Sequence, residues 1–105
     1  MVPILTTEQR RESLAKGLRI RSRRASYRAA LKDGSMNPRH IFELANGGDS
    51  AALNMRVRAL ISAMPGYGKK RTALLMHRLC ISENRRVGGL GDRQREALLT
   101  ALVKE

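Results

Sequence analysis

The sequence is short of aromatic residues, and this shortage limits the kind of core it can build. Its 105 residues include no tryptophan, one phenylalanine and two tyrosines. The core must therefore consist of Leu, Ile, Val, Met and Ala side chains, a composition that favours helices packed on helices over a β-sandwich. A chain of this length has room for a single modest core. We expect an all-α protein.

Cysteine and long apolar segments are also scarce. A single cysteine, Cys80, excludes an intrachain disulfide and fits a reducing compartment. No apolar run approaches the roughly 18 residues that cross a membrane, and Arg10-Arg11-Glu12 interrupts any secretory signal near the N-terminus. These absences predict a soluble cytoplasmic protein that does not insert into membranes.

Residues that carry catalysis or bind metals are sparse and scattered. The two histidines, His40 and His77, are far apart, and His77 with Cys80 makes at best half of a metal site. The sequence offers no paired carboxylates for a plausible cleft. We therefore expect no enzymatic activity, no metal and no cofactor. Cys80 is expected to be an inert core residue at the end of an apolar helix.

Acidic residues are few compared with basic ones. There are 21 Lys and Arg against nine Asp and Glu, which gives a net charge of +12. Most of this charge lies at the two ends, because residues 1–33 carry nine basic and three acidic residues and residues 64–105 carry nine and four. Such self-repulsion is typical of proteins that bind a polyanion, and it predicts binding to nucleic acid.

The basic N-terminal third is expected to form one long helix. Thr6 or Thr7 can cap it, no proline interrupts it, and Gly34 is a suitable stop. Its apolar face is thin, so much of the helix should project into solvent or against an anion. The residues expected on that face are Leu14, Leu18, Ala25 and Ala29. We assign the long helix to residues 1–34 and a compact domain to residues 35–105.

Capping signals predict the first elements of that domain. Asn37 followed by Pro38 begins a helix that ends before Gly47-Gly48. Asp49 or Ser50 can cap a short turn after it. Apolar spacing over residues 57–64 then predicts a core-facing helix, which Pro65 ends.

The last third is expected to form a helix, a turn and a second helix. Residues 68–80 are predicted to be a largely buried helix, and Ser82 is predicted to cap a short turn through Arg86. A final helix follows Gly91. The buried positions expected on these two helices are Leu74, Leu75, Met76, Leu79, Ala97, Leu98, Ala101 and Leu102.

Two Gly-x-Gly turns, Gly66-Tyr67-Gly68 and Gly89-Leu90-Gly91, each stand before a helical stretch rich in Lys and Arg. Glycine lets backbone N–H groups approach an anion closely because no Cβ intervenes. The helix N-terminus behind the turn adds free N–H groups and the positive end of its dipole. Two such turns on one chain predict two contacts with one polyphosphate, for which the DNA backbone is the obvious candidate.

The segment Met64-Pro65-Gly66-Tyr67-Gly68 resembles the hairpin of the helix-hairpin-helix family, which binds the DNA backbone without reading sequence. Together with residues 89–99, Arg85-Arg86 and residues 5–10, it resembles the actinobacterial integration host factor family. That resemblance implies a long N-terminal helix followed by a helix-two-turn-helix domain. It also implies a nucleoid-associated protein that bends and compacts double-stranded DNA and assists phage integration. The chain differs from the family pattern in having Gly88 where an arginine is usual.

The leading hypothesis is a non-enzymatic, nucleoid-associated protein of the cytoplasm that binds double-stranded DNA. We expect it to be a monomer in solution, with a phage integrase complex as a further partner. The residues expected to contact DNA are Gly66, Gly68, Lys69, Lys70, Arg71, Arg85, Arg86, Gly89, Gly91, Arg93, Gln94 and Arg95 around the turns, and Arg19, Arg23, Arg24 and Arg28 on the first helix. Gln94 and Arg95 are the candidates for base contacts.

Two alternatives rest on the same features. An RNA-binding or ribosome-associated structural protein would hold rRNA phosphates with the same glycine turns, as a ribosomal protein with this module does. An interaction module would place the basic helix against an acidic protein or a membrane surface. A preference for duplex DNA over structured RNA, or binding to vesicles, separates these hypotheses.

Overall fold

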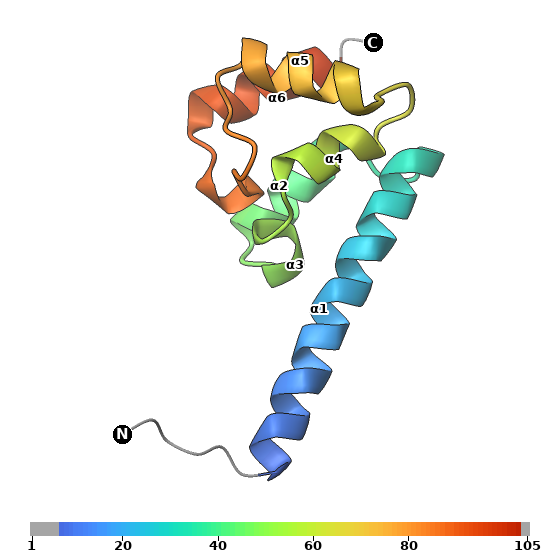
Figure 1. Ribbon diagram of the computed structural model, residues 1–105, viewed down its shortest axis with the longest axis vertical. Helices are drawn as coiled ribbons and strands as arrows, with labels where there is room; N and C mark the ends of the chain where they lie inside the picture. Colours follow the sequence, from blue (N-terminus) through green and yellow to red (C-terminus); the bar gives the residue numbers. More distant parts are fainter. Residues whose placement is uncertain (1–6, 104–105) are drawn as a thin grey trace.

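The computed structural model describes residues 7–103, and its regular elements are helices over that range (Figure 1). They are α1 (Thr7–Asp33), α2 (Pro38–Asn46), α3 (Ser50–Leu53), α4 (Val57–Ala63), α5 (Lys69–Arg78), the 3-10 turn η1 (Val87–Gly89) and α6 (Asp92–Val103). Figure 1 shows α1 as a long rod that runs along one side of a compact group of shorter helices and extends beyond it. The expected all-α architecture is confirmed.

Helix α1 ends where the sequence predicts. Gly34 takes a φ of +87°, the left-handed conformation that glycine adopts without steric cost, and this terminates the helix after Asp33. Of the two candidate caps, Thr7 is the first helical residue of α1, and Thr6 lies outside the described residues. The division into a helix at 1–34 and a domain at 35–105 stays a prediction.

The face of α1 that packs on the domain is not the predicted one. Leu14 and Leu18 are 63% and 60% exposed, and Ala25 and Ala29 are exposed as well. The domain instead contacts the opposite face, where Tyr27 is half-buried and Leu31 is 1% exposed. Tyr27 and Leu31 bury more surface than two alanines, and they stand on the C-terminal half of α1 that lies beside the domain.

Local capping explains α2 and α3. The Asn37 side chain accepts a hydrogen bond from the His40 N–H at 3.2 Å, and the His40 Nδ1 accepts one from the Asn37 N–H at 3.1 Å. This closes a capping box in front of α2, with Pro38 at its first position. Asp49 caps α3 by accepting from the Ala52 N–H at 3.0 Å. Both predicted caps are confirmed.

Helix α4 lies at the centre of the domain, between α1 and α5 (Figure 1). Val57, Leu60 and Ile61 are fully buried, as the apolar spacing predicted. The core around them is aliphatic apart from one aromatic ring. Its buried members are Leu31, Ile41, Phe42, Ala45, Ala52, Met55, Val57, Leu60, Ile61, Leu75, Met76, Ile81, Val87, Leu90, Leu98 and Leu102.

Two expectations about buried positions in the last third were wrong. Leu74 is 69% exposed, because helix α5 buries only one face, through Thr72, Leu75 and Met76. Ala97 is exposed, because the face of α6 that meets the core passes through Leu98 and Leu102. The segment from Ser82 to Arg86 forms the predicted short turn, which the Arg85 N–H closes by donating to the Ser82 carbonyl at 3.0 Å.

Cys80 is exposed, which corrects the expectation of a core cysteine. It follows Leu79, the C-cap residue of α5, and takes a φ of +56°, in the left-handed region. The Ile81 N–H donates to the Met76 carbonyl at 2.9 Å and the Cys80 N–H to the His77 carbonyl at 3.1 Å. These two bonds form a Schellman motif, whose left-handed position is usually glycine.

Replacing Cys80 by glycine is expected to stabilise the protein by about 0.5–1 kcal/mol. Relief of roughly 1–2 kcal/mol of left-handed backbone strain outweighs the roughly 0.4–1 kcal/mol of added chain entropy in the unfolded state. Thermal unfolding of the two proteins measures the difference. Cys80→Ala is the control, because it removes the thiol and keeps the strain. Equal stabilisation by both variants would contradict the strain argument.

Candidate nucleic-acid interface

The first glycine turn leaves the N-terminus of α5 open. Gly66 takes a φ of +85°, and Gly68 is the N-cap residue of α5 with no side-chain cap. The first bond of the helix runs from the Thr72 N–H to the Gly68 carbonyl at 3.0 Å. The N–H groups of the first turn therefore lack acceptors within the helix, and Lys69 and Lys70 are exposed beside them. This is the geometry that binds an anion.

Arg71 lies against the same turn. Its guanidinium stacks over the Tyr67 ring, with 4.5 Å between Cζ and the ring centroid, and its Nη1 is 3.4 Å from the Gly66 carbonyl oxygen. These two contacts hold the glycine turn in place, whether or not Arg71 also contacts a ligand.

The second glycine turn is held from both sides by its own side chains. Arg85 Nη1 donates to the Gly89 carbonyl at 3.0 Å, and the Gly91 N–H donates to Gln94 Oε1 at 3.1 Å. Gln94 Nε2 in turn lies 3.4 Å from the Cys80 carbonyl oxygen. The amide of Gln94 is therefore occupied as a cap at the start of α6, whereas Arg93 is exposed one position before it.

Arg86 lies on a backbone bridge that ties this turn to the start of α4. The Val57 N–H donates to the Arg85 carbonyl at 3.0 Å, and the Val87 N–H donates to the Met55 carbonyl at 2.8 Å. Arg56 and Arg86 face each other across this antiparallel bridge. Arg86 Nη1 also donates to the Asn54 carbonyl at 2.6 Å. The bridge therefore brings two basic segments of the chain side by side.

Arg95 is half-buried between α6 and α2. Its Nη1 donates to Asn46 Oδ1 at 2.6 Å, and its Cζ lies 5.8 Å from the centroid of the Phe42 ring. The Nε atoms of Arg85 and Arg95 are buried, and among the described residues they have no hydrogen-bond partner. Both arginines therefore belong in part to the packing of the domain.

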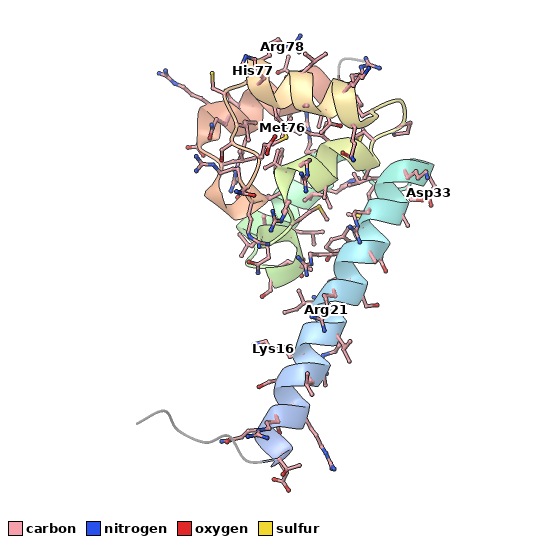
Figure 2. All side chains as sticks on the ribbon, in the orientation of Figure 1. Lys16, Arg21, Asp33, Met76, His77 and Arg78 are labelled. Atoms are coloured by element: carbon pink, nitrogen blue, oxygen red, sulfur yellow. The ribbon has the colours of Figure 1, made fainter. Side chains whose placement is uncertain are left out.

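Four arginines line a groove between α1 and the start of α4. Arg21, Arg24 and Arg28 come from α1, Arg56 precedes α4, and Met55 and Ala59 form its floor. None of these lining residues is acidic. Figure 2 places Arg21 on the part of α1 where the helix leaves the domain. We call this surface the arginine groove.

A polar cluster fixes the direction of α1. Asp49 Oδ1 accepts from Arg23 Nη1 at 2.9 Å, and Asp49 Oδ2 accepts from the Tyr27 hydroxyl at 2.9 Å. Although burial opposes its ionisation, the hydrogen bonds from Tyr27, the Ala52 N–H and Arg23 together lower the pKa of Asp49. Burial and the bond to Asp49 raise the pKa of Tyr27. Arg23 therefore contacts a carboxylate in this structure.

Comparison with known proteins agrees with this arrangement. Residues 31–102 match the S13-like H2TH domain family. Over 98 residues the chain is 41% identical to the integration host factors of Mycobacterium tuberculosis and Mycolicibacterium smegmatis, and these alignments cover 93% of this chain and 92% of each relative. The chain belongs to the integration host factor family. It is also 39% identical over 93 residues to the integration host factor of Streptomyces coelicolor, covering 89% of this chain and 86% of that one.

A solved structure shares the fold of this integration host factor family member. The structure of sIHF bound to an 8 bp palindromic DNA matches with a TM-score of 0.75 and 34% sequence identity, and the match covers 84% of this chain and 98% of that chain. The family resemblance inferred from the glycine turns and the helix-two-turn-helix fold are therefore both confirmed.

The predicted contact residues are placed on several surfaces. Lys69, Lys70 and Arg93 are exposed beside the helix N-termini, and Arg24 and Arg28 line the arginine groove. Arg19 is exposed on α1 and is not among the groove residues. The predicted contacts did not include Arg21, which shares a helical face with Arg24 and Arg28 by spacing alone. Arg56 was an open candidate, because it flanks the helix at residues 57–64 and could equally belong to the solvated surface.

Replacing Asp49 by asparagine is expected to destabilise the protein by about 1–2 kcal/mol at pH 7. Asparagine keeps the N-cap of α3 but loses the charge that Arg23 and Tyr27 contact. Folding lowers the pKa of Asp49. The stabilisation that its carboxylate provides is therefore fully present above the unfolded-state pKa of about 3.9, and it is lost as the pH falls through the lower pKa of the folded state. Urea unfolding at pH 7 and pH 2 tests this. An equal difference at both pH values would contradict it.

Proposed function

We propose that this chain is a non-enzymatic, nucleoid-associated protein that binds the phosphate backbone of double-stranded DNA and bends or compacts it. The observation that carries this proposal is the uncapped N-terminus of α5, with Lys69 and Lys70 exposed beside it. The helix dipole disfavours cations at such a terminus, so two lysines there are stabilised by a bound anion. The sIHF relative, whose solved structure contains DNA, supports DNA as the source of that anion.

The second basic surface supports bending or compaction. The arginine groove is formed by α1 and the start of α4, whereas the first glycine turn follows the end of α4. A protein that holds phosphates at two separate places can wrap or bridge DNA without dimerising. On this basis we propose that the monomer is the active species. We also propose a phage integrase complex as a further partner, because the resemblance to the family implies it.

Little sequence preference is expected. Gln94 and Arg95, which were the candidates for base contacts, are engaged with Gly91 and Asn46. Contacts with phosphate fix position on the duplex and carry no sequence information by themselves. The exposed cations then make a largely electrostatic interface, consistent with a nucleoid-associated protein.

Gel-shift competition tests the proposal directly. The full chain is titrated into several unrelated duplexes of equal length, with structured RNA as the competitor. Similar affinity for every duplex and weak competition by RNA are the expected results. Preferential binding to RNA would favour a ribosome-associated protein instead. A bend is then measured by energy transfer between dyes at the two ends of a duplex.

A further inference from the structure

A cleft between α4 and α5 places several side chains that have no role in the contacts above next to Lys69 of the first glycine turn. Arg58 and Ser62 line it from α4, and Lys69 and His77 line it from α5. The segment at residues 81–83 closes one end. Figure 2 shows His77 on α5 next to Met76, whose buried side chain forms part of the apolar floor. We call this surface the α4–α5 cleft.

A pair of hydroxyl groups lies within the cleft. Ser62 Oγ and Thr72 Oγ1 are 3.2 Å apart, and Thr72 is 2% exposed. Each hydroxyl has one hydrogen and two lone pairs. The bond between them uses only one of the two hydrogens, so the other is left to donate to a further acceptor. The cleft therefore combines neutral donors with cationic side chains.

The charges of the cleft favour an anion. Arg58 and Lys69 come from different helices, and Glu83 is the one carboxylate among the lining residues. A guanidinium matches the oxygens of a phosphate with two parallel donors, and an ammonium adds a compact charge. Lys69 also belongs to the open N-terminus of α5, so the cleft adjoins the phosphate site already described.

We propose that the α4–α5 cleft binds a phosphate group through Arg58, Lys69 and the Ser62–Thr72 hydroxyl pair. The phosphate belongs either to the DNA strand held at the first glycine turn or to a small phosphorylated molecule. The first source rests on the proposed function, whereas the second does not. Arg58 is then a ligand-contacting residue outside the two glycine turns and the arginine groove.

The two histidines supply a spectroscopic test in the full chain. His77 lines the cleft, whereas His40 lies in the capping box of α2 and serves as an internal reference. The imidazole NMR signals are followed while inorganic phosphate, and separately a short duplex, is added at fixed pH and ionic strength. We expect the His77 signals to move and the His40 signals to stay. Arg58→Ala is expected to abolish the response to inorganic phosphate.

DNA binding of Arg58→Ala distinguishes the two sources. If the phosphate is that of the DNA strand, the variant binds a duplex about tenfold more weakly, and its slope of log affinity against log salt is reduced by about 1. The matched control is Arg39→Ala, which removes an exposed arginine outside the cleft. If the variant binds DNA like wild type but loses the phosphate response, the source is a small phosphorylated molecule.

The proposal is overturned if neither phosphate nor DNA moves the His77 signals and if Arg58→Ala and Arg39→Ala bind DNA equally well. Failure of the proposed function has a different signature, because the wild-type chain then fails to bind duplex DNA at all. In that event the response to inorganic phosphate alone decides whether the cleft is a phosphate site.

Discussion

Raising the salt concentration from 50 to 200 mM is expected to weaken binding to duplex DNA by about 10³–10⁵-fold. Each phosphate neutralised by Lys or Arg releases condensed counterions, and roughly 6–10 such contacts give a slope of log affinity against log salt of about −5 to −9. The lysines at α5, the exposed Arg86 and Arg93, and the arginine groove together supply cations in that number. Fluorescence anisotropy with a labelled duplex measures the slope.

The size of the slope separates the proposed function from its alternatives. A basic helix that docks on an acidic protein would bind duplex DNA weakly, and a slope near zero would contradict the proposal. Lys69→Ala combined with Lys70→Ala is the internal check, because losing two phosphate contacts should make the slope shallower by about 2. Both lysines are exposed, so the fold should not change.

Replacing the four groove arginines Arg21, Arg24, Arg28 and Arg56 with alanine is expected to reduce DNA affinity at least about 100-fold. The slope of log affinity against log salt should become shallower by about 3–4, because these side chains line one groove whose lining residues include no carboxylate. The bend, measured by energy transfer across the duplex, should fall toward that of free DNA, because the variant loses the phosphate contacts that α1 and Arg56 make away from the first glycine turn. Circular dichroism verifies that α1 remains helical.

Two comparisons make this result interpretable. Four lysines in place of the four arginines keep the charge, and they should keep most of the salt slope while weakening contacts that need the planar guanidinium. Arg39→Ala with Arg78→Ala removes exposed charge away from the groove. If that pair lowers affinity and bending as strongly as the groove variant, net charge and not the groove is responsible.

Much of the fold follows from signals that lie within a few residues of each other. Asn37, Asp49 and Gly34 end or begin helices through their own side chains or their own φ angle, so their effect does not depend on distant parts of the chain. The glycine turn before α5 likewise depends only on the residues of the turn itself. These features could be predicted, together with the family to which the chain belongs.

Cationic side chains were harder to place, because many of them also hold the domain together. Arg85 and Arg95 look like surface charges in the sequence, but Arg85 bonds to the Gly89 carbonyl of its own turn and Arg95 to the Asn46 side chain on α2. Gln94 is likewise used as a cap. A long polar side chain can contact either a residue of another helix or a ligand. The helical spacing in the sequence gives only the position of that residue on its own helix, so it does not say which contact forms.

The sequence by itself determined the helices, their caps, the excess of positive charge and the two glycine turns. The tertiary structure decided which charges act together. Arg56 joins Arg21, Arg24 and Arg28 only because α4 packs against α1, and Arg23 meets Asp49 across 26 residues. Contacts over such separations depend on how whole helices pack, and packing is set by the shape and burial of the complete core rather than by any local pattern.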